Sequence, residues 1–202
     1  MKYTIVIAAV VGLLLFSGKK KNNSITSILF IGDSNTATPF SYADQLAKKF
    51  PTIRMKKIAL IGAKTDWILA QLKSELTKNK YDLVCVMGGS NDIYALSKID
   101  NAEQNLNSIY NISHQNGAKV LAITPPNKNF FIKRTDLKQK LLFSLINWIK
   151  SNQNTDYFVN FWDITNNKSF FTVADGFLHA QSPAHKILAN TIINTINLVP
   201  VK

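Results

Sequence analysis

Short apolar runs alternate along the chain with longer stretches in which apolar positions recur at helical spacing. Glycine, proline or polar residues bound the short runs, which is typical of buried strands. These runs lie at residues 27–31, 55–61, 83–87, 119–124 and 157–162. The stretches with helical spacing lie at residues 42–50, 65–78, 102–116, 137–151 and 183–198. Because each predicted strand is followed by a predicted helix, the pattern indicates a parallel sheet covered by helices on both faces.

A separate apolar and uncharged run lies at residues 5–16, with Lys2 before it and three lysines at 19–21 after it. It is shorter than the ~20 residues of a typical spanning helix and has the length of a signal-peptide core. No small-x-small cleavage site follows, and the lysines disfavour export of the C-terminal part. We expect residues 1–24 to be a membrane anchor with its lysines at anionic headgroups. A signal peptide of a secreted protein and a tail buried in an assembly are the alternatives. We expect residues 25–202 to form one domain.

Composition narrows the classes of partner. The 202 residues carry a formal net charge of +12, almost wholly from scattered lysines. This charge indicates either a solvated surface or attraction to membranes and anionic glycans. The sequence has no nucleic-acid motif, so we expect no nucleic-acid partner. Cys85 is the single cysteine of the sequence, which excludes an internal disulfide. Because it lies in an apolar run, we expect its thiol to be buried in the core. Abundant Lys, Asn and Ile indicate an AT-rich bacterial or phage genome.

Small polar residues directly follow two of the predicted strands. Gly-Asp-Ser-Asn at 32–35 follows the first strand, and Gly-Gly-Ser-Asn-Asp at 88–92 follows the third. The carboxyl ends of strands are where open α/β folds place their chemistry. We expect Gly32 to let the backbone turn there, so that Ser34 exposes its hydroxyl. Because Gly-Asp-Ser alone is ordinary turn composition, Ser34 is a candidate nucleophile only together with the later blocks.

Four blocks in this order resemble the GDSL-type esterases and lipases of the SGNH hydrolase superfamily, over roughly residues 25–199. The matching residues are Ser34 in Gly-Asp-Ser, Gly62 in Ala-Leu-Ile-Gly-Ala, Asn91 in Gly-Ser-Asn-Asp, and His179 after Asp175. The resemblance implies a flavodoxin-like, three-layer α/β/α sandwich with a five-stranded parallel sheet in the order 2-1-3-4-5. It implies no metal and no organic cofactor.

The resemblance also implies a role for each residue. Ser34 is the nucleophile, His179 is the base, and Asp175 orients the imidazole. The backbone N–H groups of Ser34 and Gly62 and the side-chain amide of Asn91 form the oxyanion hole. The residue types suit acyl transfer, because a serine hydroxyl needs a base and neutral imidazole is suitable near pH 7. An aspartate on the other ring nitrogen fixes the tautomer and stabilises the imidazolium.

The fourth block departs from the family pattern. The family usually has Asp-x-x-His, whereas three residues separate Asp175 from His179. Gly176 is suited to a one-residue bulge that would absorb the difference. His185 is the competing candidate for the base, although we expect it in the first turn of the last helix. Asp33 and Asp92 are expected to have structural roles, in the turn around Ser34 and in fixing a loop or capping a helix.

We therefore expect a serine esterase that cleaves a carboxylic ester through an acyl-serine intermediate. The narrower expectation is a short acyl group such as acetyl, carried by a cell-surface or capsular glycan. The alternative is a non-catalytic glycan-binding or structural protein, in a phage virion or at a cell surface, that keeps the SGNH fold. The irregular spacing of Asp175 and His179 motivates this alternative. The sequence leaves the oligomeric state open.

Overall fold

The computed structural model describes residues 25–96, 99–127, 136–166, 168–171 and 179–199. Within them, five parallel strands form one sheet in the order β2-β1-β3-β4-β5. The strands are β1 (Ser27–Gly32), β2 (Arg54–Ala59), β3 (Leu83–Met87), β4 (Lys119–Ile123) and β5 (Tyr157–Val159). The strand order that the resemblance implied is confirmed.

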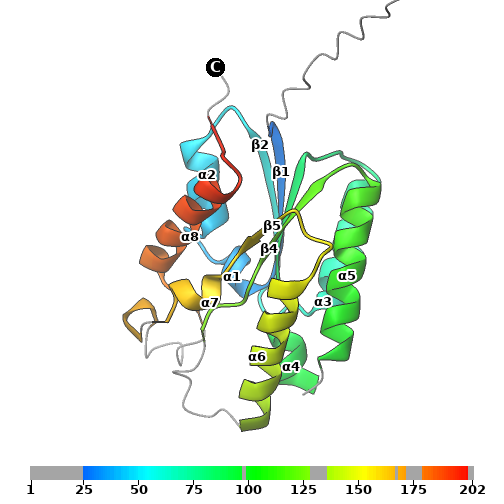
Figure 1. The fold of residues 1–202 in the computed structure, drawn as a ribbon. Coiled ribbons are helices and arrows are strands. Elements are labelled where there is room, and N and C mark those ends of the chain that lie inside the picture. The colour runs from blue at the N-terminus through cyan, green and yellow to red at the C-terminus, as the bar shows by residue number, and fades with distance from the viewer. Residues whose placement is uncertain (1–24, 97–98, 128–135, 167, 172–178, 200–202) are drawn as a thin grey trace, which may run out of the picture.

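Helices cover both faces of this sheet, so that the predicted three layers are confirmed (Figure 1). One face carries α2 (Tyr42–Lys49) and α8 (Ser182–Thr195). The other face carries α3 (Thr65–Leu76), α5 (Asp100–Gln115) and α6 (Asp136–Ser151). Shorter elements follow the strands and line the carboxyl-terminal edge of the sheet. These are α1 (Ser34–Ala37), α4 (Ser90–Leu96), α7 (Phe161–Ile164) and the 3-10 helix η1 (Lys168–Phe170).

The central strands are buried on both sides, which explains their uninterrupted apolar sequences. Side chains of a strand point alternately to opposite faces. Phe30 of β1 therefore joins the core under α2 and α8, and Leu29 joins the core under α3, α5 and α6. Cys85 of β3 lies in the first of these cores, where burial raises the pKa of its thiol. The thiol stays protonated, as a structural core residue does.

The outer strands end earlier than the sequence pattern predicted. β2 ends at Ala59 because the chain turns at 60–63, where Ala63 N–H donates to the carbonyl of Leu60 at 3.1 Å. β5 ends at Val159 because Asn160 caps a helix that the sequence analysis missed. The side-chain oxygen of Asn160 accepts the backbone N–H of Asp163 at 3.2 Å. Local capping thus ends a strand inside an apolar run.

The described chain enters the fold at the amino-terminal edge of the sheet, opposite Ser34. There a single carboxylate oxygen of Asp82 accepts the backbone N–H groups of Thr26 and Ser27, each at 2.9 Å. It also accepts both of their hydroxyl groups, at 2.8 and 2.9 Å. The segment 1–24, for which we predicted a membrane anchor, lies outside the described residues. Within the described residues, no helix has the length and apolar character needed to cross a bilayer.

Candidate active site

Ser34 is the first residue of α1 and follows β1 through a single residue, Asp33. Asp33 is completely buried and caps α1 by accepting the backbone N–H of Asn35 at 2.9 Å. Its other carboxylate oxygen accepts the hydroxyl of Ser90, at the start of α4, at 3.3 Å. Asp33 therefore joins two strand ends and fixes the turn that carries Ser34, which is the structural role expected of it.

Gly32 is required by space rather than by backbone angle. A Cβ atom at this position would lie 2.5 Å from the carbonyl oxygen of Met87 and 2.5 Å from Oγ1 of Thr36. Gly32 is not among the described glycines with positive φ, so the turn that we expected it to permit needs the space left by the missing side chain and not a left-handed backbone angle. The close approach of β1 to β3 and α1 explains the glycine instead.

At Gly62 the backbone angle, and not the available space, favours glycine. Its φ is +76°, in the left-handed region, and an added Cβ would meet nothing within 4 Å. Gly62 lies in the turn at 60–63, which begins beside the Ser34 turn because Leu60 N–H donates to the carbonyl of Gly32 at 3.3 Å. The predicted second block therefore lies next to the first block at the same edge of the sheet.

Asn91 is joined to the Gly62 turn by its side chain. Its Nδ2 donates to the carbonyl oxygen of Ala63 at 2.8 Å. A side-chain amide nitrogen carries two hydrogens, so the bond to Ala63 orients the group and leaves the second hydrogen for another acceptor. The third block thus meets the second block at the start of α4.

Asp92 links α4 to α3 and is buried. Its carboxylate accepts the backbone N–H of Thr65 at 3.1 Å and the Thr65 hydroxyl at 2.7 Å. Burial raises the pKa of Asp92, and the bonds from Thr65 offset this only in part. Because both oxygens face the first residue of α3, Asp92 fixes the loop before that helix, as the sequence analysis expected.

His179 lies on the segment that leads into α8. The next residue, Ala180, donates its backbone N–H to Oδ1 of Asn35 at 3.4 Å. Gln181 N–H donates to the carbonyl of Phe170 at 2.7 Å, and the Gln181 side-chain amide donates to the carbonyl of His179 at 3.2 Å. The first of these bonds holds the histidine segment against α1, and the second holds it against η1.

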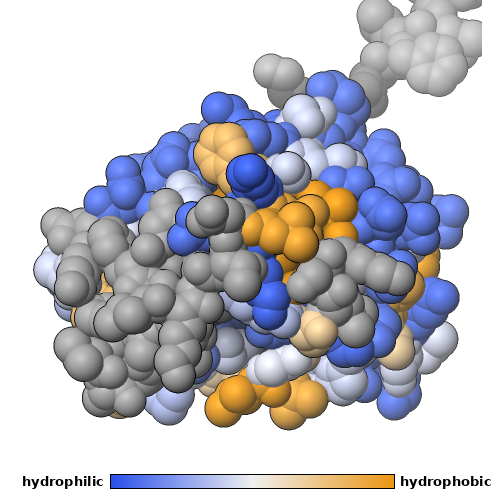
Figure 2. Space-filling model, turned by 90° about the horizontal axis from the view of Figure 1, so that it is seen from below, coloured by the Kyte–Doolittle hydropathy of each residue, from blue (hydrophilic) through white to orange (hydrophobic). Residues whose placement is uncertain are grey.

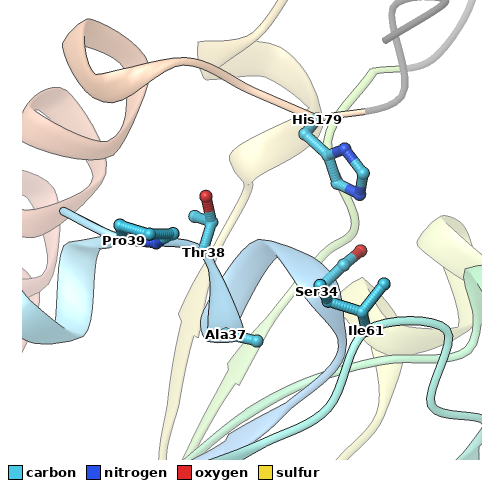
Figure 3. A pocket seen from close by; sticks show the side chains of 6 residues that line it. All are labelled: Ser34, Ala37, Thr38, Pro39, Ile61 and His179. Atoms are coloured by element: carbon cyan, nitrogen blue, oxygen red, sulfur yellow. The ribbon is translucent and has the colours of Figure 1, made fainter.

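Ser34 and His179 line one pocket of about 140 Å³. Figure 3 shows the His179 ring directed toward the Ser34 hydroxyl, although the two residues come from opposite ends of the described chain. The remaining wall is mostly apolar. Its residues are Ala37, Thr38, Pro39 and Ile61.

His185, the competing candidate, lies elsewhere. It is 1% exposed in α8 and packs against the Tyr42 ring, with centroids 6.1 Å apart and planes 15° apart. The Phe161 ring lies 5.5 Å away on a tilted plane. Burial lowers the pKa of His185 to about 4, against weaker raising effects of the Ala180 backbone and Asp44. His185 is not among the residues that line the Ser34 pocket.

Asp175, the predicted orienting carboxylate, lies outside the described residues. Among the residues that are described, no three His, Cys, Asp or Glu side chains gather as a metal site would require. Of the predicted site residues that the structure describes, Ser34 and His179 line one pocket. Gly62 and Asn91 lie at the same edge of the sheet but are not among the residues that line this pocket.

Sequence reasoning missed two contributors to this region. The position of Asn35 next to Ser34 is visible in the sequence. Its hydrogen bond to Ala180 is not, because that bond joins residues 145 positions apart. Ile61 was predicted as the last residue of a strand, whereas it lies in a turn and lines the pocket.

Several solved esterases share this fold. A catalytic mutant of an acetylxylan esterase from Geobacillus stearothermophilus matches with a TM-score of 0.69 and 19% identity, over 89% of this chain and 97% of the other. A psychrotrophic esterase from Pseudoalteromonas sp. matches with a TM-score of 0.67 and 19% identity, over 85% and 97%. The protein TesA matches with a TM-score of 0.67 and 21% identity, over 84% and 97%. At these identities the likeness shows the fold alone. A search among curated proteins found no match.

A family model covers most of the described domain. The model of the GDSL-like lipase/acylhydrolase family matches residues 30–187, from the middle of β1 into α8. The match includes Ser34, Gly62, Asn91 and His179. The chain therefore belongs to the GDSL-like lipase/acylhydrolase family and is a carboxylic ester hydrolase.

Proposed function

We propose that this enzyme hydrolyses its ester through an acyl-serine intermediate, with Ser34 as nucleophile and His179 as general base and then acid. One observation carries the proposal: the two side chains line the same pocket, and the imidazole is directed toward the hydroxyl (Figure 3). The bonds of Asp33 hold the nucleophile in place, and the bond between Asn35 and Ala180 does the same for the histidine segment.

The reaction follows from these positions. His179 takes the hydroxyl proton while Ser34 Oγ attacks the ester carbonyl, which forms a tetrahedral oxyanion. The intermediate collapses when the carbon–alkoxide bond breaks, and the leaving oxygen takes the proton from the imidazolium. Water then loses a proton to His179 and attacks the acyl carbon, which forms a second tetrahedral oxyanion. When the bond between this carbon and Ser34 Oγ breaks, the acid leaves and Oγ takes the proton from the imidazolium.

The oxyanion is proposed to be bound by the backbone N–H groups of Ser34 and Gly62 and by the second amide hydrogen of Asn91. The bond from Asn91 to Ala63 supports this, because it holds the donor beside the Gly62 turn before substrate arrives. Donors that need no reorganisation stabilise the transition state most, by about 3 kcal/mol for one such group.

Asp175 is proposed to orient His179, on the strength of the family pattern alone. Three residues separate Asp175 from His179 in the sequence, so its role is tested by its own substitution. If Asp175 holds the imidazole, Asp175→Asn lowers kcat by orders of magnitude with little change in KM, because the wrong tautomer is favoured.

The test of the whole proposal is hydrolysis of p-nitrophenyl acetate by the wild type beside Ser34→Ala, His179→Ala and His185→Ala. Loss of activity in the first two variants and its retention in a folded His185→Ala variant are expected. A fluorophosphonate probe should label the wild type and fail to label Ser34→Ala. Activity that survives His179→Ala but is lost in folded His185→Ala would assign the base to His185 instead.

The narrower substrate proposal is an acetyl ester on a glycan. Its supports are the small volume of the pocket and the fold that the chain shares with an acetylxylan esterase. Acetate release from acetylated oligosaccharides, compared with release from simple acetate esters, tests it. The membership of an ester hydrolase family argues against the non-catalytic glycan-binding or structural alternative.

For the location we propose a membrane anchor at residues 1–24. The described chain begins at the amino-terminal edge of the sheet, whereas the pocket lies at the carboxyl-terminal edge (Figure 1). An anchor joined there leaves the pocket clear of the anchoring point. Membrane fractionation of the full chain beside a Leu13→Asp, Leu14→Asp variant tests this, and equal soluble fractions would refute it.

A further inference from the structure

Thr38 lines the pocket, and its hydroxyl has no hydrogen-bond partner among the described residues. The residue is half-buried and caps the carboxyl end of α1. Apart from Thr52, every other threonine that the structure describes bonds a protein group through its hydroxyl. Thr52 differs because it is exposed in a surface turn. Among the described threonines, only Thr38 therefore presents an unbonded hydroxyl to the pocket.

The backbone of Thr38 is fixed on both sides. Its N–H donates to the carbonyl of Ser34 at 2.9 Å, and its carbonyl accepts the N–H of Ser41 at 3.3 Å. Pro39 follows and disfavours the helical conformation at Thr38, whose ψ of 143° is extended. The hydroxyl is thus carried on a rigid part of the chain, so little ordering is needed when it binds a substrate group.

Thr38 lies one helical turn beyond the proposed nucleophile. Because its N–H bonds to the carbonyl four residues earlier, Thr38 and Ser34 share one face of α1, with their Cβ atoms about 5–6 Å apart. Figure 3 shows the Thr38 hydroxyl directed away from α1, toward the side of the pocket on which His179 lies. Thr38 is therefore close to any substrate group bound between Ser34 and His179.

The leaving alcohol is the part of the ester that faces Thr38. Gly62 and Asn91, which are proposed to bind the oxyanion, are not among the residues that line this pocket. The leaving oxygen lies beside His179, because His179 gives it a proton. Since His179 and Thr38 line the same pocket, the alcohol carbons next to that oxygen lie beside Thr38. A hydroxyl on the carbon next to the ester-bearing carbon is only a few bonds from the leaving oxygen.

The chemistry of the wall favours a hydrogen bond at this position. The side chains of Ala37, Pro39 and Ile61 are aliphatic and form no hydrogen bonds. An alcohol hydroxyl that loses water against them needs a partner, and the Thr38 hydroxyl both donates and accepts. A methyl group in the same place would instead cover the Thr38 hydroxyl and leave it without water. Figure 2 looks onto this edge of the sheet and shows hydrophilic side chains around an apolar area, so a polar alcohol meets polar groups outside the pocket.

We propose that Thr38 is a specificity-determining residue, whose hydroxyl binds a second hydroxyl of the alcohol on the carbon next to the one that carries the ester. The inference rests on the proposed function and deepens its substrate, because a sugar monoacetate carries such a hydroxyl. A monoester of a small diol carries it as well. The chemistry common to both is an ester beside a free hydroxyl.

A matched pair of esters measures this interaction, with the full chain as enzyme. 2-Hydroxyethyl acetate and n-propyl acetate have nearly the same size and differ by a hydroxyl in place of a methyl group. Dividing each kcat/KM by the rate of alkaline hydrolysis of the same ester removes the difference in leaving-group acidity. The wild type should then favour the hydroxyl ester about threefold to tenfold, which is the effect of one hydrogen bond.

Three variants test whether Thr38 is the source of this preference. Thr38→Val keeps the shape of the side chain and removes its hydroxyl, so the preference should disappear. Thr38→Ser keeps the hydroxyl and should retain most of the preference. Thr52→Val is the matched control, because it removes an unbonded hydroxyl at the amino-terminal edge of the sheet, and it should keep the wild-type preference. An unchanged preference in a folded Thr38→Val enzyme, or an equal loss in Thr52→Val, would overturn the inference.

A second pair of esters separates sugars from small diols. It consists of a monoacetylated methyl pyranoside whose neighbouring hydroxyl is free and the analogue that lacks this hydroxyl. A preference in this pair that Thr38→Val removes assigns the bound hydroxyl to a sugar. A preference confined to the small esters assigns it to a diol and overturns the glycan acetate as substrate.

Failure of the inference differs from failure of the proposed function. If hydrolysis of p-nitrophenyl acetate depends on Ser34 but the wild type shows no preference in either pair, the inference is wrong and the proposed function stands. A Thr38→Val enzyme that loses the same factor with both members of a pair also overturns it, because Thr38 then acts on every ester alike. If the wild type hydrolyses no ester and Ser34 is not labelled by the fluorophosphonate, the proposed function fails and the inference fails with it.

Discussion

The backbone N–H of Ala180 donates to the side-chain oxygen of Asn35 at 3.4 Å, between residues 145 positions apart. Asn35 is buried and follows Ser34 directly, and Ala180 follows His179 directly. One hydrogen bond therefore joins the neighbour of the proposed nucleophile to the neighbour of the proposed base. We therefore expect Asn35 to act as a positioning residue for the pair.

Removing this bond should reduce turnover more than substrate binding. We expect Asn35→Leu to lower kcat about tenfold to a hundredfold with KM within a factor of three, because a misplaced base mainly affects the transition state. Asn35→Asp keeps the acceptor oxygen and should recover part of the loss. Steady-state kinetics with thermal melting of both variants measure this. If kcat falls only in proportion to the folded fraction, Asn35 is merely structural.

Removing the Asn91 side chain and removing a hydrogen bond to its neighbour Asp92 should have different effects, the first on kcat and the second on stability. Asn91→Ala removes the proposed oxyanion donor and should lower kcat by about a hundredfold or more. The loss of its bond to Ala63 should cost only about 1 kcal/mol of stability. Thr65→Val removes one bond to Asp92 and should instead destabilise the fold by about 1–3 kcal/mol, because it leaves a buried carboxylate short of a partner. Kinetics and urea unfolding of both variants test the distinction, and a stable Asn91→Ala enzyme of normal kcat would contradict the oxyanion role.

His185 should make the fold sensitive to acid. Its folded pKa of about 4 lies below the ordinary value of 6.5, so the unfolded chain binds a proton at a higher pH than the folded chain. The titration of His185 therefore does not change the free energy of unfolding above about pH 7. The free energy of unfolding falls as the pH drops from 6.5 toward 4. Between pH 7.5 and 5 the loss is about 2 kcal/mol.

His185→Phe keeps an aromatic ring against Tyr42 and removes the titrating group. Its free energy of unfolding should fall less than that of the wild type between pH 7.5 and 5. Urea unfolding at the two pH values, with the wild type beside the variant, measures the difference. Parallel losses in the two proteins would show that His185 does not carry the acid sensitivity.

Two glycines should respond differently to an added methyl group. Gly32→Ala places a Cβ 2.5 Å from the Met87 carbonyl, beside the Ser34 turn. We expect it to cost about 1–3 kcal/mol of stability and to lower kcat, because the strand end must shift. Gly117→Ala meets nothing within 4 Å but has a φ of +83°, so it should cost about 1 kcal/mol without affecting kcat. A normal kcat in a destabilised Gly32→Ala would contradict this account.

The sequence by itself determined the layers of the fold. Strands buried on both faces need continuous apolar runs, and helices that cover a sheet need apolar positions at helical spacing, so local composition carries both signals. It also located the Ser34 and Asn91 blocks, because small polar residues that follow buried strands fall at one edge of the sheet. The strand order came from the family resemblance, since local pattern does not record which strands are neighbours.

The tertiary structure alone decided which groups meet. The sequence favoured His179 as the base and kept His185 as a competing candidate. Packing separates them, because it buries His185 against the rings of Tyr42 and Phe161 and leaves His179 in the pocket with Ser34. The exposure of Ile61 was equally hidden, because an isoleucine at the end of an apolar run is typical of a strand. Contacts such as that of Asn35 with Ala180 depend on how segments 145 residues apart pack, and that packing is a property of the whole chain.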